Sequence, residues 1–251
     1  MRRPDLRPAI LAVQFLTRLP TPQVRDFSPA LLSRAVVWFP ATGLLLGALL
    51  AAAVLGGQLV DPWLAALAGL LAWAWLTGGL HLDGLADMAD GLGAAHRDPQ
   101  RFLAVLKDPH LGSFGVLALI LQCASKLVLL MLLASQHQGM ALLPMLVLVP
   151  GWARWGVYLW QSLPPLASGM AEQFGWRQTR HAAWCNGLLL AGLSLWLAPA
   201  LLLAPLLAWA YRCWLKARLG GVTGDCLGAG IELLETALLC VLLLASAIIA
   251  L

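Results

Sequence analysis

Residues 62–91 read PWLAALAGLLAWAWLTGGLHLDGLADMADG, an apolar run that ends in a cluster of aspartates. The apolar part is as long as a membrane-spanning helix, which needs about 20 mainly apolar residues. If the residues that follow are helical, a turn of ~100° per residue places Asp83, Asp87 and Asp90 within roughly 60° of one another. The stretch therefore predicts a membrane helix that leads into an acidic patch.

The composition extends this prediction to all 251 residues. Hydrophobic residues make up 61% of the chain and charged residues 11%, with a mean hydropathy of +0.81, whereas soluble domains are about 25% charged. We therefore predict an all-α fold, a polytopic transmembrane helical bundle that forms one integral membrane domain over residues 1–251. The apolar runs give seven candidate spans: 36–56, 62–80, 113–135, 141–160, 184–198, 200–215 and 230–251.

One part of the chain leaves the number of spans at six to seven. Pro199 and Pro205 interrupt a long apolar stretch, which forms either a short helical hairpin or one kinked span. Near the N-terminus, residues 9–19 predict a short helix on the membrane surface, with Arg18 directed at the lipid headgroups. We expect no cleavable signal peptide there, because polar residues break the apolar run.

The distribution of positive charge predicts the orientation in the membrane. Lys and Arg cluster before the first span and in alternate connections, whereas residues 57–61 and 136–140 contain neither. By the positive-inside rule, the N-terminus and the polar loops 81–112, 161–183 and 212–229 face the cytoplasm. Orientation and anionic lipid explain the net charge of +4 better than nucleic acid does, so no nucleic-acid partner is expected.

The acidic patch predicts a metal site. Three neighbouring carboxylates repel one another unless they hold a cation, and oxygen ligands favour Mg²⁺ or Mn²⁺ over Zn²⁺. Mg²⁺ held by a few carboxylates keeps positions open for phosphate oxygens. We therefore predict Mg²⁺ at Asp83, Asp87 and Asp90, and phosphate chemistry at the membrane surface. The five isolated cysteines indicate neither a disulfide framework nor a zinc site.

The polar segment after the acidic patch carries candidate phosphate ligands. Arg97, Arg101 and Lys107 can neutralise phosphate oxygens that the metal does not reach. Asp108 is a candidate substrate contact in the same segment. The alternative reading treats Lys107 and Asp108 as solvated loop charges.

The start of the third candidate span is a second place where an anion can bind. Gly112 and Gly115 let backbone N–H groups approach an anion, and we predict Ser113, another candidate substrate contact, as the N-cap of the helix. A glycine-rich turn at residues 219–229 carries Thr223 and Asp225, which can contact phosphate or ribose or add a carboxylate ligand. Glu232 and Glu235 follow, and they either favour the positive end of the helix dipole or contact substrate.

Three further polar residues lie in or beside apolar runs. Lys126 is near the middle of the third span, where it either snorkels, forms an ion pair or contributes to a substrate site. Arg154 is close enough to the cytoplasmic end of its span to join the acidic site. His81 projects away from Asp83 on a regular helix, which favours a structural role; it joins the acidic face only if a glycine breaks the helix.

Five motifs in matching order resemble the cobalamin synthase (adenosylcobinamide-GDP ribazoletransferase) family. They are FLTRLPTP from residue 15, WFPATGLLLG from 38, GGLHLDGLADMADG from 78, LKDPHLGSFGVLAL from 106 and LGGVTGDCLGA from 219. The resemblance runs from about residue 15 to about 235, and residues 140–210 contribute least to it. Five motifs in register are far more specific than any one alone.

The resemblance implies a Mg²⁺-dependent enzyme of a bacterial cytoplasmic (inner) membrane, acting late in vitamin B12 biosynthesis. It would join adenosylcobinamide-GDP to α-ribazole or its 5′-phosphate and release GMP. The implied partners are corrinoid and nucleoside small molecules, the lipid bilayer, and either a second copy of the chain or other late B12 enzymes.

On this resemblance the candidate site residues take specific roles. Asp83, Asp87 and Asp90 bind the metal, unless one of them is the base for the attacking hydroxyl. Lys107 is a catalytic candidate that holds the pyrophosphate together with the arginines at 97 and 101. The substrate contacts complete the set: His81, Asp108, Ser113, Lys126, Arg154, Thr223 and Asp225.

Other classes of protein fit the sequence less well. CDP-alcohol phosphotransferases carry a related acidic motif, but here no Arg follows the segment from Asp83 to Ala86, and the final spacing is two residues instead of three. A membrane prenyltransferase would carry a second aspartate-rich motif, for which Asp225 and Glu232 are a poor substitute. A transporter would show inverted repeats and paired charges at the midplane.

Overall fold

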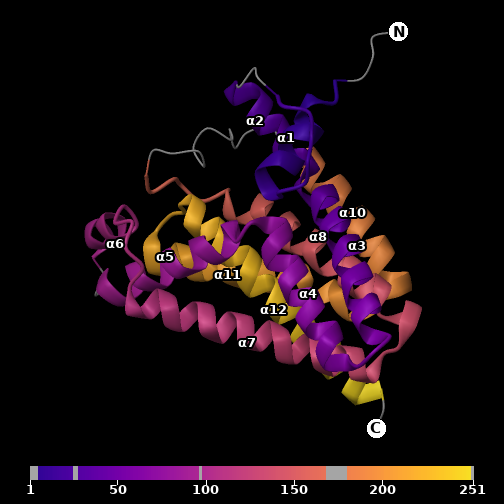
Figure 1. Cartoon of the computed structure of the whole chain (residues 1–251). Coiled ribbons are helices and arrows are strands. Elements are labelled where there is room, and N and C mark those ends of the chain that lie inside the picture. Colours follow the sequence, from indigo (N-terminus) through magenta and orange to yellow (C-terminus); the bar gives the residue numbers. More distant parts are fainter. Residues whose placement is uncertain (1–4, 25–27, 96–97, 168–179, 250–251) are drawn as a thin grey trace.

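The computed structural model describes residues 5–24, 28–95, 98–167 and 180–249, and this part of the chain is a bundle of helices without a β-strand (Figure 1). Four helical segments in it are long and apolar enough to cross a membrane: Ala30–Gln58, Ser113–Gln136, Gly139–Trp160 and Gly224–Ile248. The predicted all-α membrane bundle is therefore confirmed. These segments contain α2 (Pro29–Ala35), α3 (Phe39–Gln58), α7 (Ser113–Gln136), α8 (Leu143–Trp160) and α12 (Gly224–Ile249), with the 3-10 turns η1 (Val36–Trp38) and η2 (Gly139–Ala141).

The second predicted span ends in a sharp bend. Asp61 caps the N-terminus of α4 (Pro62–Thr77), and the helix ends at Gly78 and Gly79, whose φ values of 65° and 75° suit glycine. The next helix, α5 (Leu80–Ala95), turns by 86°. The acidic motif thus lies on its own helix. We place α5 outside the membrane-spanning segments, as the polar loop predicted from residue 81 requires.

Residues 184–215 form two helices. These are α10 (Arg180–Leu197) and α11 (Ala204–Leu219), and the 3-10 turn η3 (Pro199–Leu203) joins them at the prolines. Neither is among the candidate spans of the described residues, which number four, or five if α4 and α5 form one broken span. By length and composition, the described residues thus hold four or five candidate spans, compared with the six to seven predicted, because prolines and bends divide the apolar runs into separate helices.

Side chains lock one end of the bundle together. The Gln58 amide donates to the carbonyl oxygens of Ala134 and His137, at 2.7 Å each, and its oxygen accepts from Gly139 N–H at 3.0 Å. His137 also lies 2.7 Å from Ser246 near the end of α12. At the other end lie α5, the short helix α6 (Pro99–Val105) and the beginnings of α7 and α12 (Figure 1).

The N-terminal helix packs against the body of the bundle. Helix α1 (Arg7–Leu16) buries Leu11, Ala12 and Leu16, and the Arg18 N–H donates to the Leu76 carbonyl oxygen at 2.7 Å. The short helix predicted at residues 9–19 is thus present. The segment that follows α1 is held by this hydrogen bond to the last turn of α4, beside the bend that precedes the acidic motif.

Candidate functional site

Glycines bring the acidic helix against the start of the last helix. A side chain added at Gly84 of α5 would lie 3.0 Å from the Asp225 carbonyl oxygen, and one at Gly228 of α12 would lie 3.4 Å from the His81 Cα. Small residues at a crossing let two helix backbones approach closely, as in membrane helix pairs generally. This approach places Asp225 beside the aspartates of α5.

The result is a group of carboxylates that we call the open cluster: Asp83, Asp87 and Asp225. Asp83 is exposed and the other two are partly buried, and none has an ion pair within the described part of the chain. Burial, followed by repulsion from Asp83, Asp225 and Asp90, raises the pKa of Asp87 to about 6. The cluster therefore carries negative charge that the surrounding protein does not neutralise.

A cavity of about 190 Å³ opens beside this cluster. One wall carries His81, Asp83 and Asp225 from α5 and α12. Apolar side chains also line the cavity, including Phe15 of α1 and Phe39 of α3. The helix break at Gly78 and Gly79 precedes His81, so the histidine and the first aspartate both occupy the first turn of α5 and line the same cavity.

Asp90 has a different environment from the other aspartates of the motif. Its two carboxylate oxygens accept the backbone N–H groups of Gly112 and Gly115, both at 2.8 Å, and its side chain is buried. The anion at the start of α7 is thus a side chain of the protein itself. The prediction that Ser113 caps this helix was wrong: Gly112 is the N-cap residue, no side chain of the helix caps it, and Ser113 is exposed.

Thr223 orders the first turn of α12. Its hydroxyl accepts from the Cys226 N–H at 3.3 Å and donates to the Asp225 carboxylate at 3.4 Å. The side chain is buried. Thr223 therefore lies next to the open cluster and helps to hold Asp225 in place.

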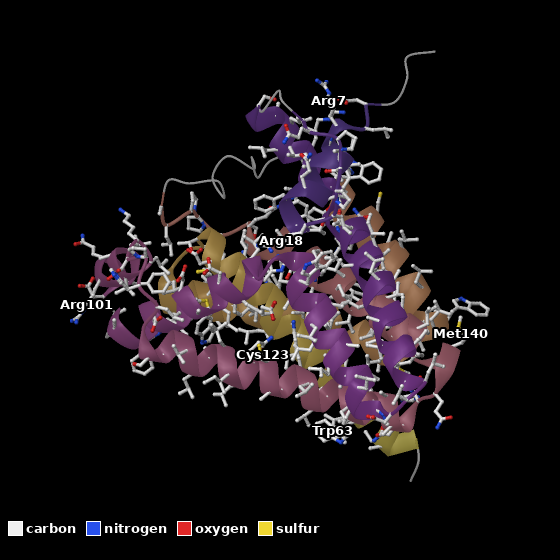
Figure 2. The ribbon with its side chains drawn as sticks, in the orientation of Figure 1. Arg7, Arg18, Trp63, Arg101, Cys123 and Met140 are labelled. Carbon is white, nitrogen blue, oxygen red and sulfur yellow. The ribbon has the colours of Figure 1, made fainter. Side chains whose placement is uncertain are left out.

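The predicted basic phosphate ligands lie on or after α6. Arg101 extends outward from α6 (Figure 2) and is exposed, as is Lys107. The Asp108 carboxylate lies 2.6 Å from His110, and hydrogen bonds from His110 hold the pKa of Asp108 below its usual value. Arg97 lies outside the described residues.

A second group of charges, which we call the buried network, lies in the core. The Lys126 ammonium is 2.7 Å from Glu232 and 2.6 Å from Glu235, and Arg154 also binds Glu235. Lys126 also lies over the Trp73 ring, 4.0 Å from its centroid. The ion-pair reading of Lys126 is thus confirmed, whereas Arg154 binds Glu235 and does not pair with the open cluster.

This pairing was not predicted from the sequence. Its signal was present: two glutamates three residues apart in an apolar helix, with one lysine and one arginine in two other apolar helices. Equal numbers of opposite charges in apolar segments indicate that the charges pair, because an unpaired charge in a membrane is costly. The helix dipole had offered a local explanation for the glutamates, but α12 begins well before them, at Gly224.

The open cluster alone does not provide a complete set of metal ligands. Within residues 5–24, 28–95, 98–167 and 180–249, no three His, Cys, Asp or Glu side chains converge closely enough to hold a metal ion. Its ligands are all oxygens, which suits Mg²⁺, and Mg²⁺ in proteins often has only one or two carboxylates plus substrate phosphates. The chemistry of the donors therefore fits a cation that is completed by a phosphate ligand.

Comparison with known proteins places the chain in a family. Residues 8–243 match the family model described as cobalamin-5-phosphate synthase. The chain is 60% identical to the adenosylcobinamide-GDP ribazoletransferase of Laribacter hongkongensis, over 93% of this chain and 95% of the relative. The proteins of that name from Thiobacillus denitrificans and Brevibacillus brevis are 55% and 34% identical, covering 93% and 92% of this chain and 94% and 95% of the relatives. No solved structure gives a significant match.

Proposed function

The chain belongs to the cobalamin-5-phosphate synthase family and is a transferase of substituted phosphate groups, and on this premise we propose the reaction and the site that performs it. The proposed reaction transfers the adenosylcobinamide phosphate group from adenosylcobinamide-GDP to α-ribazole or its 5′-phosphate. A hydroxyl oxygen of the ribazole bonds to the cobinamide-linked phosphorus. The bond from that phosphorus to the bridging oxygen breaks, and GMP leaves.

One observation carries the location of the site. Asp83 and Asp225 come from two helices that are far apart in the sequence and line one cavity, and neither has an ion pair among the residues described. Burying or crowding carboxylates without a partner is costly. Their retention beside a cavity supports a cationic ligand there.

We propose Mg²⁺ as that ligand, held by one or two of the carboxylates of Asp83, Asp87 and Asp225 together with substrate phosphate. When bound, the ion would offset the negative charge of the pyrophosphate. We leave Asp90 out of this set, because both of its oxygens already accept backbone N–H groups. One carboxylate of the open cluster accepts the proton of the attacking hydroxyl.

The basic residues of the α6 region complete the proposal. Arg101 and Lys107 are exposed and belong to the segment that follows the acidic helix, so they can meet the phosphates of a ligand that extends out of the cavity. Arg97 precedes α6 in the sequence and is proposed for the same role. Asp108 is not included, because its carboxylate is held by His110.

The corrinoid needs more room than the cavity offers. A groove of about 1210 Å³ between α8, α10 and α11 lies next to it, and Gln161 lines both spaces. Indole rings line the groove, among them Trp155, Trp184 and Trp209. We propose that this groove receives the macrocycle while its phosphate reaches the open cluster.

We place the chain in a bacterial cytoplasmic membrane with the site facing the cytoplasm. The distribution of Lys and Arg supports this orientation. The connections that lack basic residues gather at the end of the bundle held by Gln58, and the acidic helix lies at the other end. Cysteine labelling of whole cells at residues 98 and 225 tests it, and labelling from outside would contradict it.

The test of the function is an assay of the purified chain in liposomes. Adenosylcobinamide-GDP, α-ribazole 5′-phosphate and Mg²⁺ are supplied, and GMP and the corrinoid product are followed by chromatography. We expect product that disappears with EDTA and in Asp83→Asn. Absence of product from folded protein that binds Mg²⁺ would contradict the proposed reaction and favour another pyrophosphate substrate.

A further inference from the structure

His81 connects the two groups of charge. Its ring lies on α5 with 2% of the residue exposed, and it lines the same cavity as Asp83 and Asp225. On its other side, the ring nitrogen Nδ1 is 3.3 Å from the Arg154 guanidinium. A single ring thus contacts both the buried network and the candidate reaction cavity.

The contact with Arg154 fixes which ring nitrogen carries the proton. A guanidinium only donates hydrogen bonds, so Nδ1 must accept. A neutral imidazole has one N–H, which must then be on Nε2. Because Nδ1 accepts from the guanidinium, it carries no proton of its own, and the ring is neutral.

The Nε2 atom has no hydrogen-bond partner in the described structure and is shielded from solvent. Leaving a buried N–H without an acceptor costs free energy, and native proteins mostly avoid it. Because His81 lines the cavity, an acceptor in the cavity would satisfy this donor. The neighbouring carboxylates, by contrast, serve a cation.

We propose that the Nε2–H of His81 donates a hydrogen bond to a phosphoryl oxygen of the substrate, and that Arg154 is the positioning residue that holds His81 in this tautomer. This proposal rests on the proposed function, because it needs a phosphate ligand in the cavity. No proton is transferred: the imidazole stays neutral and acts as a fixed donor.

The buried network keeps Arg154 in place. Glu235 binds both Arg154 and Lys126, and Glu232 binds Lys126 and accepts from the Gln122 amide at 2.8 Å. The arginine therefore cannot turn toward the open cluster without leaving Glu235.

Two substitutions at one position test the donor. A glutamine amide can place its N–H near the position of Nε2, whereas an asparagine amide matches Nδ1. In the liposome assay we expect His81→Gln to keep turnover within about tenfold of wild type. His81→Asn should lower kcat by about 10- to 100-fold, the range for one hydrogen bond to a charged group. The KM for α-ribazole 5′-phosphate and the unfolding temperature should change little.

A measurement that does not require turnover tests the hydrogen bond from His81 independently of the proposed reaction. NMR of protein labelled with 15N-histidine, in detergent, reports the protonated ring nitrogen, and the signal missing in His81→Gln identifies His81. We expect protonation at Nε2 in wild type, loss of this preference in Arg154→Met, and a shift of the Nε2 signal on adding Mg²⁺ and pyrophosphate.

Several outcomes would overturn the proposal. They are protonation at Nδ1 in wild type, an Nε2 signal that pyrophosphate leaves unchanged, or His81→Asn turning over like His81→Gln. A different outcome is that the ring is protonated at Nε2 and responds to pyrophosphate, but wild type forms no cobalamin product. This outcome would support the role of His81 as a donor and contradict the proposed substrate.

Discussion

The open cluster and the buried network both include carboxylates of α12, but these carboxylates differ in whether they are paired with a cation. Asp225 lies in the first turn of α12 with no ion pair in the described structure, whereas Glu232 and Glu235, further along the same helix, are both paired. The buried network balances two cations with two carboxylates; the open cluster has carboxylates only. The difference separates charges that are paired within the fold from carboxylates that we propose bind a cation.

Breaking the buried network should have the largest effect on stability. Glu235→Gln removes the carboxylate that binds both Lys126 and Arg154, and breaking a buried pair costs about 3–5 kcal/mol. Unfolding in detergent, followed by circular dichroism, measures this loss. Glu232→Gln is the matched control, since only Lys126 pairs with it, and it should cost less. Equal small losses in both variants would refute the role of Glu235 as the centre of the network.

Neutralising the open cluster should affect activity and leave the fold intact. We expect Asp83→Asn to lower turnover at least 100-fold, in the range of losses for a group that stabilises charge in the transition state. The unfolding temperature should stay the same or rise, because repulsion with Asp87 is removed. Asp61→Asn at the opposite end of α4 is the control, because asparagine also caps helices well. Near-normal turnover in Asp83→Asn would remove Asp83 from the site.

The approach of α5 to α12 can be tested by adding one methyl group. Gly84→Ala would place a Cβ 3.0 Å from the Asp225 carbonyl oxygen, so the helices must separate slightly. We expect a cost of about 1–3 kcal/mol, as for other overpacked contacts, with a fall in turnover. Gly56→Ala, which has open space around it, should be neutral or stabilising. Measurements of unfolding and activity in the two variants test whether α5 and α12 approach this closely.

The smallest effect concerns pH. The pKa of Asp87 is raised to about 6 by burial and by the neighbouring carboxylates, so between about pH 4 and 6 the folded chain binds more protons than the unfolded chain. Stability should therefore fall as pH rises through this window. Because Asp87 is only partly buried, solvent reduces the effect to about 1 kcal/mol or less.

Thermal unfolding of wild type and Asp87→Asn from pH 4 to pH 7 measures this effect. We expect a shallower dependence in the variant. Adding Mg²⁺ at pH 7 should raise the unfolding temperature of wild type more than that of the variant, if the cation binds the open cluster. A wild-type stability that rises between pH 4 and 6 would contradict the assignment.

Long apolar runs were predictable because hydropathy is a local property. The predicted spans 36–56, 113–135, 141–160 and 230–251 correspond to α3, α7, α8 and α12. The bend after α4 was only partly predictable. Gly78 and Gly79 signalled a break, but the 86° turn depends on how α5 packs against α12.

The site was predictable in its chemistry more than in its pairing. The acidic motif and Asp225 were recognised separately as candidates, because aspartates beside an apolar run are conspicuous. Their proximity, and the separate use of Asp90 at Gly112 and Gly115, depend on contacts between distant parts of the chain. No local pattern reveals which of several aspartates will meet a backbone N–H.

The pairing of Lys126 sets an order for assembly of the protein in the cell. Its partners Glu232 and Glu235 lie on the last helix, so α7 is made long before the carboxylates that neutralise its lysine. A lysine in the middle of a lone membrane helix costs about 2.5–3.5 kcal/mol on insertion scales. A chain that ends before residue 232 lacks both glutamates, so its Lys126 has neither of the ion pairs that the described structure shows.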